Sequence, residues 1–600
     1  MSTSRQTHYL DRLKETNIEL ELLEKQAAQI RWSRISLFIL FGVGVWQYFS
    51  QEAQWILYAS LTFLAVFFFL IRLSSQKAKK IRRCMASVKV FERELKALKF
   101  DMSSEPSGKE FHDPNHAFSA DLDLFGERSI YQYLNRSASI QGKRLLAHEL
   151  KLGHRTPDEI EARQKAVIEL SQIEVWREEF MTSGMLSESH EEEEAKLETW
   201  VESPFTGYSG IFYSTMLKVL PLVSLCCLVL VFLDRMPFNW FLLYILLPSL
   251  VAGSSAKLLN EEASHISGSK ESLEKYSGLL QMIESRPFTS EFLSESQRKL
   301  VGPTGTAQES FRELMRIVEG LDNRLNAVGW LMLNVFLLWD VRYGIRLRKW
   351  KEENKKVLSQ WFEVIAEFEL INSMATMTYN RPKLNFPKAN DDNTGVKART
   401  MGHLLLNPKE RVDNDFIVDG ERFFILTGAN MAGKSTFLRA LGTNWVLASM
   451  GSPVCAESFD WTPSPLFSSM RTSDSLADHE SYFFAELKRL KFLIDETEKG
   501  NLFIILDEIL KGTNSEDKAR GSKLFVEKLL ERDVKGIIAT HDLSLCTLSE
   551  EYPKAVRNLS FEVEFTEDDL SFDYKLREGV CKNMNASFLL EKMGLINKSS

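Results

Sequence analysis

A glycine-rich stretch after an apolar run constrains this chain more than any other feature. It reads TGANMAGKST at residues 427–436, between the apolar run 423–426 and the helix-like run 437–441. Because glycine has no Cβ atom, Gly428 and Gly433 allow backbone angles and close approaches that a side chain would block. Backbone N–H groups at the start of the following helix can then bind phosphate oxygens. The GxxxxGK[ST] spacing between strand and helix therefore predicts a phosphate-binding loop in an α/β domain.

The spacing also assigns chemistry to individual residues of the loop. Lys434 is expected to reach the β- and γ-phosphates of a nucleotide, and the Ser435 hydroxyl to bind Mg²⁺. The predicted nucleotide contacts are Gly428, Ala429, Asn430, Met431, Ala432, Gly433, Lys434, Ser435 and Thr436.

Two later apolar runs end in residues that fit the same site. The run 502–506 ends in Asp507 and Glu508, and the run 537–540 ends in His541. Asp507 is placed to hold Mg²⁺ or its water shell, and Glu508 to orient or deprotonate the attacking water. Open α/β sheets bind ligands at the carboxyl ends of their strands, which is where His541 is expected. A structural histidine after a strand is the alternative for His541.

These stretches together resemble one known family. TGANMAGKST, LDEILKGTNSEDK (506–518) and ATHD (539–542) are similar to the nucleotide-binding domain of the MutS family, the ABC-type ATPases of DNA mismatch repair. The resemblance implies a P-loop, ABC-type α/β domain that uses ATP and Mg²⁺. Residues 473–486 resemble the family's signature region, which implies that Ser481 reaches the γ-phosphate held by a second subunit. The stretch 414–416 resembles the segment in which an aromatic, here Phe416, stacks on adenine.

Composition limits the functions that the whole chain can serve. The 600 residues exceed what one core normally holds, so several domains are expected. The net charge is −8, from 74 basic and 82 acidic residues, whereas proteins that mainly grip duplex DNA are more often basic. The six cysteines show no metal-binding spacing, which indicates reduced thiols in a cytosol-facing protein.

Two strongly apolar runs, 35–49 and 55–73, stand near the start of the chain and are joined by a short polar turn. The second is long enough to span a bilayer core of about 30 Å, although it carries Arg72 near its end. Basic residues flank the pair but are missing from the turn, so the positive-inside rule places both ends in the cytoplasm. We expect a membrane hairpin here, with a buried helical hairpin as the alternative. A second apolar pair, at 219–252, predicts another membrane hairpin, again with a buried core pair as the alternative.

The remaining sequence is mostly helical in pattern. Residues 122–383 resemble the MutS core or lever domain, interrupted by the second apolar pair. We expect a buried core helix at 330–339, because this run is too short to span comfortably, and a long lever helix at 342–378. The predicted organisation is an amphipathic helix (1–34), a transmembrane hairpin (35–73), a juxtamembrane helix and linker (74–121), the lever domain (122–383) and the ATPase domain (384–600). The tail at 559–576 alternates like an antiparallel hairpin and is followed by a last helix.

The resulting hypothesis is a membrane-anchored MutS-like ATPase in the inner or cytoplasmic membrane, with its ATPase domain in the cytoplasm. The resemblance implies a homodimer that shares ATP between its two copies, coupled to DNA binding at mismatched or structured DNA. The family's mismatch-reading domain and its C-terminal dimerisation element have no counterpart in this sequence. The alternative is an ATP-driven scaffold or transducer that acts on membrane helices or on a protein partner of unknown identity.

Overall fold

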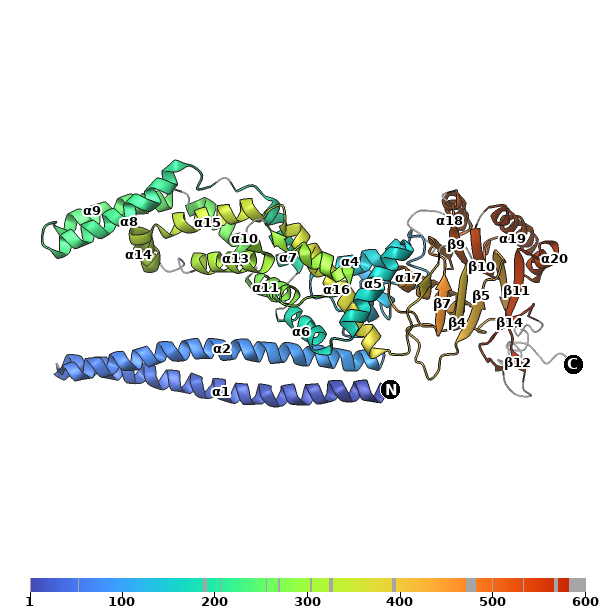
Figure 1. Cartoon of the computed structure of the whole chain (residues 1–600), viewed down its shortest axis with the longest axis horizontal. Helices are drawn as coiled ribbons and strands as arrows, with labels where there is room; N and C mark the ends of the chain where they lie inside the picture. Colours follow the sequence, from blue (N-terminus) through green and yellow to red (C-terminus); the bar gives the residue numbers. More distant parts are fainter. Residues whose placement is uncertain are drawn as a thin grey trace.

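The computed structural model places a long helical arm at one end of the molecule and an α/β domain at the other (Figure 1). It describes residues 2–51, 53–186, 191–205, 207–254, 256–267, 270–302, 305–322, 327–390, 395–470, 482–498, 500–532, 534–565 and 570–581. The fold is mixed α/β and mostly helical.

The first two helices form one antiparallel hairpin along the arm (Figure 1). Helix α1 covers Ser2–Gln51 and α2 covers Gln54–Leu98, so each apolar run continues without a break into the polar helix beside it. Polar contacts join the two helices, since Lys77 Nζ donates to Gln26 Oε1 at 2.6 Å. The expected amphipathic and juxtamembrane helices therefore pair with one another, as extensions of the apolar hairpin.

The polar end of this hairpin is fastened to the lever domain. Tyr9 is fully buried, and its hydroxyl donates to Asn380 Oδ1 at 3.0 Å. Glu94 is also fully buried and accepts from Arg136 at 2.6 Å and from Asn380 Nδ2 at 2.8 Å. Buried charges are retained when they are paired and hydrogen-bonded in this way. The hairpin therefore contacts the last turn of the helix that leads into the α/β domain.

The rest of the arm is a stack of helices around the buried helix α16, Leu358–Asn380. The others are α3 (Ile130–Leu134), α4 (Ile140–Leu152), α5 (Pro157–Ser171), α6 (Glu174–Gly184), α7 (Glu191–Glu202), α8 (Ile211–Phe232), α9 (Phe238–Gly253), α10 (Ala256–Ser267), α11 (Lys270–Glu284), α12 (Glu291–Arg298), α13 (Ala307–Asp322), α14 (Ala327–Leu337) and α15 (Trp339–Asn354), with the short β1 (Val301–Gly302) and β2 (Gly305–Thr306). Local signals explain several starts: Thr156 and Glu159 form a capping box before Pro157 in α5.

Three expectations for the arm need correction. The single helix expected at 342–378 is two helices, α15 and α16, because Val357 N donates to Asn354 O in a turn between them. The helix expected to be buried at 330–339 is α14, whose Met332 is 57% exposed. The expected linker before Leu122 is packed rather than free, since Asp121 is buried and accepts from Ser468 Oγ at 2.8 Å.

The α/β domain contains a six-stranded sheet of order β14-β11-β6-β10-β9-β8. Its strands are β6 (Phe423–Gly428), β8 (Leu466–Ser469), β9 (Leu502–Asp507), β10 (Val534–Ala539), β11 (Val556–Phe561) and β14 (Leu576–Glu578). All are parallel except β14, which pairs antiparallel with β11. The covering helices are α17 (Lys434–Ser449), α18 (Tyr482–Thr497), α19 (Ser515–Leu530) and α20 (Leu548–Glu551), with the short η3 (Leu543–Thr547). A parallel strand that is buried on both faces reads as an apolar run, as residues 502–506 of β9 do.

A second, four-stranded sheet of order β3-β7-β4-β5 packs beside the first and was not predicted. It contains β3 (Lys388–Ala389), β4 (Val396–Met401), β5 (Asn414–Ile417) and β7 (Ser458–Trp461). In the tail, β12 (Glu564–Phe565) and β13 (Leu570–Ser571) form a short antiparallel pair, as expected, but β11 belongs to the main sheet. The helix predicted after residue 580 lies outside the described residues.

Candidate nucleotide-binding site

The glycine-rich loop lies between β6 and α17, in the strand–loop–helix order that its sequence predicts. Gly428 has φ 155° and Gly433 has φ 104°, so both adopt conformations that side chains disfavour. A Cβ atom on Gly428 would lie 2.8 Å from the Phe561 carbonyl oxygen of the neighbouring strand. Glycine is therefore required here both by backbone angle and by close approach.

The strand order brings the predicted acids and the histidine to the mouth of this loop. Strand β10 lies between β6 and β9 in the sheet, so the carboxyl ends of the three strands are neighbours. Asp507 ends β9, and its Oδ2 accepts a hydrogen bond from Ser435 Oγ at 2.6 Å. Glu508 follows with φ 53°, and its N–H donates to the Ala539 carbonyl at 2.9 Å. This uncommon backbone conformation turns the Glu508 side chain toward His541.

Lys434, His541 and Glu508 form a connected polar group. Lys434 Nζ donates to the Gly428 carbonyl at 2.7 Å and lies 3.3 Å from His541 Nε2, which in turn lies 3.2 Å from Glu508 Oε1. Burial lowers the pKa of Lys434, while the carboxylates of Asp507 and Glu508 oppose that shift. Burial and the Lys434 ammonium also lower the pKa of His541, which favours the neutral imidazole, while Glu508 and Asp507 oppose that shift. A neutral imidazole can accept or donate a hydrogen bond, which suits a residue that positions water.

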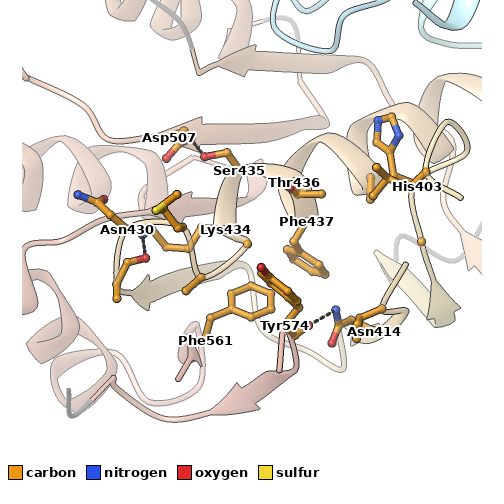
Figure 2. A pocket seen from close by; sticks show the side chains of 18 of the residues that line it. His403, Asn414, Asn430, Lys434, Ser435, Thr436, Phe437, Asp507, Phe561 and Tyr574 are labelled. Carbon is orange, nitrogen blue, oxygen red and sulfur yellow. Dashed lines mark hydrogen bonds between the residues drawn. The ribbon is translucent and has the colours of Figure 1, made fainter. Parts of the chain in front are cut away.

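The loop and strand ends line a cavity of about 640 Å³ (Figure 2). Tyr574 reaches over the loop from the tail, and a Cβ atom on Gly433 would lie 3.1 Å from its ring. Asn414 fixes this segment, because its Nδ2 donates to the Tyr574 carbonyl at 3.0 Å and its Oδ1 accepts from Leu576 N at 2.8 Å. His403 lines the far side, and burial together with Arg439 lowers its pKa to about 4. The cavity is therefore large enough for a nucleotide, and polar side chains line it both at the loop and away from it.

The structure brings most, but not all, of the predicted site residues together. The lining includes all of 429–436, together with Asp507, Glu508 and His541. Phe416 does not line the cavity: it is 2% exposed and packs edge-on against Phe424 and Phe437. Strand β5 alternates buried and exposed residues, so Phe416 points into the core. Ser481 lies outside the described residues.

The sequence reasoning missed Arg411, Val412, His403 and Tyr574, which form the wall where Phe416 was expected. Arg411 is held in place by a bidentate contact with Asp413. Asn414 also lines the cavity, and it alone gave a local signal, since a polar residue at the start of a strand often bonds to another segment. The other positions depend on contacts between distant segments.

The Ser435 hydroxyl and Asp507 carboxylate suit one divalent cation. Mg²⁺ is usually held by one or two protein oxygens while phosphate oxygens and waters complete its octahedron. The described residues contain no cluster of three or more His, Cys, Asp or Glu side chains that could hold a metal by themselves. The donor set therefore fits Mg²⁺ that arrives with a phosphate ligand.

Together these features define a class, a parallel α/β domain built around a glycine loop of the phosphate-binding type. Residues 424–593 match the family model for MutS domain V. The "DNA mismatch repair protein MutS" of Thermotoga maritima is 29% identical over 237 residues, which cover 38% of this chain and 29% of the relative. The protein of the same name from Aquifex pyrophilus is 36% identical over 178 residues, covering 29% and 20%. The human "MutS protein homolog 4" is 30% identical over 184 residues, covering 30% and 19%.

The similarity to the MutS family therefore rests on this C-terminal region, residues 424–593. The matched region spans less than a third of the length of these relatives.

Proposed function

We propose that this chain is an ATPase that hydrolyses ATP to ADP and phosphate with Mg²⁺. The observation that carries the proposal is the cavity in which the glycine loop faces Asp507, Glu508 and His541. In the proposed reaction, the loop amides and Lys434 bind the β- and γ-phosphates, and the triphosphate replaces the loop carbonyls as the partner of Lys434. Mg²⁺ bound by Ser435 and Asp507 would neutralise phosphate charge.

Glu508 is the residue that we assign to the attacking water. Its Oε1 lies 3.2 Å from His541 Nε2, so both side chains can contact one water, with Glu508 accepting its proton and His541 orienting it. Tyr574 and Arg411 line the opposite wall, and we assign the base-contacting role expected of Phe416 to this wall. As in the hypothesis from sequence, two copies would share each ATP, with Ser481 of the second copy at the γ-phosphate.

Membrane anchoring is the second part of the proposal. In the described part of the chain, two helices, α2 and α8, are long and apolar enough to cross a membrane, or three if α9 and α10, bent by 52°, make one span. Helix α1 is not among them, which agrees with the shorter apolar run 35–49. Large apolar side chains are exposed along both helical pairs, and the two turns lie at the same end of the arm (Figure 1). Apolar surface this extensive needs a partner, and lipid fits helices that are apolar all round.

Membrane insertion from this end would keep the α/β domain in the cytoplasm. Basic residues flank the first pair on the side of the lever domain, as the positive-inside rule requires. The localisation that we propose is therefore multi-pass in the inner or cytoplasmic membrane.

Two candidates remain for what the ATPase acts on. The names of the relatives favour DNA, as a mismatched or structured substrate. The contact of Tyr9 with Asn380 favours the transducer, because it joins the membrane hairpin to the end of α16 just before the α/β domain. A nucleotide-driven movement of α16 would then move the hairpin directly.

One experiment tests the ATPase and separates these candidates. The full chain in detergent is assayed for phosphate release alone and with homoduplex, mismatched and branched DNA, each over a salt series. The Lys434→Ala protein, purified in parallel, measures contaminating ATPase. Stimulation by DNA that weakens with salt supports the DNA role, and unchanged hydrolysis supports the transducer. A rate no higher than that of Lys434→Ala under every condition contradicts the proposed enzyme.

A further inference from the structure

Helix α14 exposes apolar side chains that a core helix would bury. Leu331 is 38% exposed, Met332 57% and Leu337 36%. No Lys, Arg, Asp or Glu occurs between residues 327 and 339. Apolar runs of this length are found as core helices or as short segments held in a membrane. The exposure of these three side chains argues against the first of the two.

Other residues of α14 pack on the second apolar pair, α8 and α9. Ser224 Oγ in α8 donates to the Val335 carbonyl at 2.6 Å, and the Phe336 and Phe241 rings have centroids 6.5 Å apart. Both contacts fall inside the apolar runs of α8 and α9 rather than at their polar ends. Whatever medium surrounds the apolar runs of α8 and α9 therefore also surrounds the exposed side chains of α14.

The break after α14 is closed by a buried polar ring. Leu338 has φ 46°, so the helix cannot continue directly into α15. Asn334 Nδ2 donates to the Trp330 carbonyl, Asp340 N donates to Asn334 Oδ1, and Trp330 Nε1 donates to Asp340 Oδ2, all at 3.0 Å. Asn334 and Asp340 are fully buried. Buried polar groups need partners in any protein, and in hydrocarbon the backbone groups freed at a helix break have no partner except the protein itself.

We propose that α14 is a third membrane-embedded element, whose exposed side chains contact lipid acyl chains. This inference rests on the proposed insertion of α8 and α9. Eleven residues of helix measure about 16 Å, roughly half of a bilayer core, so α14 is a partial span. Lipid is the occupant because α14 packs on α8 and α9, whose larger apolar surface includes Leu222, Leu225 and Leu228, which are also exposed.

The position of α14 connects the membrane to the lever domain. Helix α15 begins directly after the break, and Trp339 Nε1 donates to the Gly320 carbonyl at the end of α13 at 2.7 Å. Further along α15, Trp350 Nε1 donates to the Ser310 carbonyl at 2.8 Å. The depth of α14 in the bilayer therefore fixes where α15 starts against α13.

The test places a fluorescent probe at three positions of the full chain in liposomes. An NBD label is attached to Met332→Cys in a background with Cys226→Ser and Cys227→Ser. The native exposed Cys226 on α8, in a background with Cys227→Ser, reports on the second pair, and Lys349→Cys, exposed on α15, reports on water. Quenching by doxyl-labelled phosphatidylcholine is compared with quenching by iodide. Leu331→Cys replaces Met332→Cys if that variant misfolds, as judged by gel filtration and nucleotide binding.

We expect doxyl-labelled lipid to quench NBD fluorescence at residues 332 and 226, and iodide to quench it only at residue 349. Lipid quenching at 226 but iodide quenching at 332 overturns the inference and leaves the α8–α9 hairpin standing. Protection of 332 from both quenchers also overturns it, since a second copy or another protein would then cover α14. Iodide quenching at all three positions overturns the proposed membrane insertion itself.

Discussion

The two ends of this molecule use the same apolar residue types in opposite ways. In the α/β domain, Ile504 and Ile505 of β9 are fully buried, and this strand carries a polar group only at its end, Asp507. At the far end of the arm, the leucines and phenylalanines of the helical pairs lie on the surface. The sheet hides its apolar residues by itself, whereas the helical pairs require another medium to do so. Sequence motifs and their spacing therefore predict the structure of the α/β domain, whereas the length and composition of the apolar runs predict that of the helical pairs.

The largest expected effect is at the loop. Lys434→Ala removes the ammonium that binds the β- and γ-phosphates, so we expect nucleotide affinity to fall below detection for a fluorescent ATP analogue. Lys528→Ala, on the exposed side of α19, is the matched control and should bind normally. Membrane extraction of both proteins should match that of the unaltered chain. Normal nucleotide binding by Lys434→Ala would mean that the glycine loop is not part of the nucleotide-binding site.

Glu508→Gln separates binding from hydrolysis at the same end. The amide keeps the size of the side chain but cannot take a proton, so we expect hydrolysis to fall about 10²- to 10³-fold. ATP should remain bound, as measured by retention of labelled nucleotide after gel filtration. Glu531→Gln, an exposed acid at the end of α19, should leave the rate unchanged. A normal hydrolysis rate in Glu508→Gln would mean that another residue accepts the proton of the attacking water.

The placement of Glu508, Asp507 and His541 at the cavity could be predicted from sequence. Asp507 ends one buried parallel strand, Glu508 follows it and His541 follows the neighbouring strand, and neighbouring strand ends meet at one edge of the sheet. Phe416 was misassigned because its motif is short, while the period-2 alternation of β5 decides which way it points. Tyr574 lies about 140 residues after the loop in the chain, and only tertiary packing brings it there. For α14, length alone could not distinguish a core helix from a membrane helix.

Paired leucine substitutions test the contrast between the two ends directly. Leu228 on α8 is 41% exposed and Leu524 on α19 is 56% exposed. Leu228→Lys should cost about 3 kcal/mol if the residue lies in lipid, and should increase labelling of Cys226 by a membrane-impermeant maleimide. Leu524→Lys should change neither labelling nor stability, since its side chain already faces water. Equal, negligible effects of the two substitutions would mean that both leucines are in water.

The smallest expected effect concerns the contact that joins the two ends. Tyr9→Phe removes the hydroxyl that donates to Asn380 Oδ1 and leaves a buried acceptor without that donor, at a cost of about 1 kcal/mol. We expect backbone amides near Tyr9 and Phe91 to exchange hydrogen about fivefold faster through local opening. Tyr552→Phe, whose ring is on the surface, is the control and should leave exchange unchanged.

If ATP slows exchange at this contact in the unaltered chain but not in Tyr9→Phe, the hydrogen bond transmits nucleotide binding to the hairpin. If ATP has the same effect in both proteins, the Tyr9 hydroxyl only fastens the hairpin, and coupling must pass through other contacts such as Glu94 with Arg136.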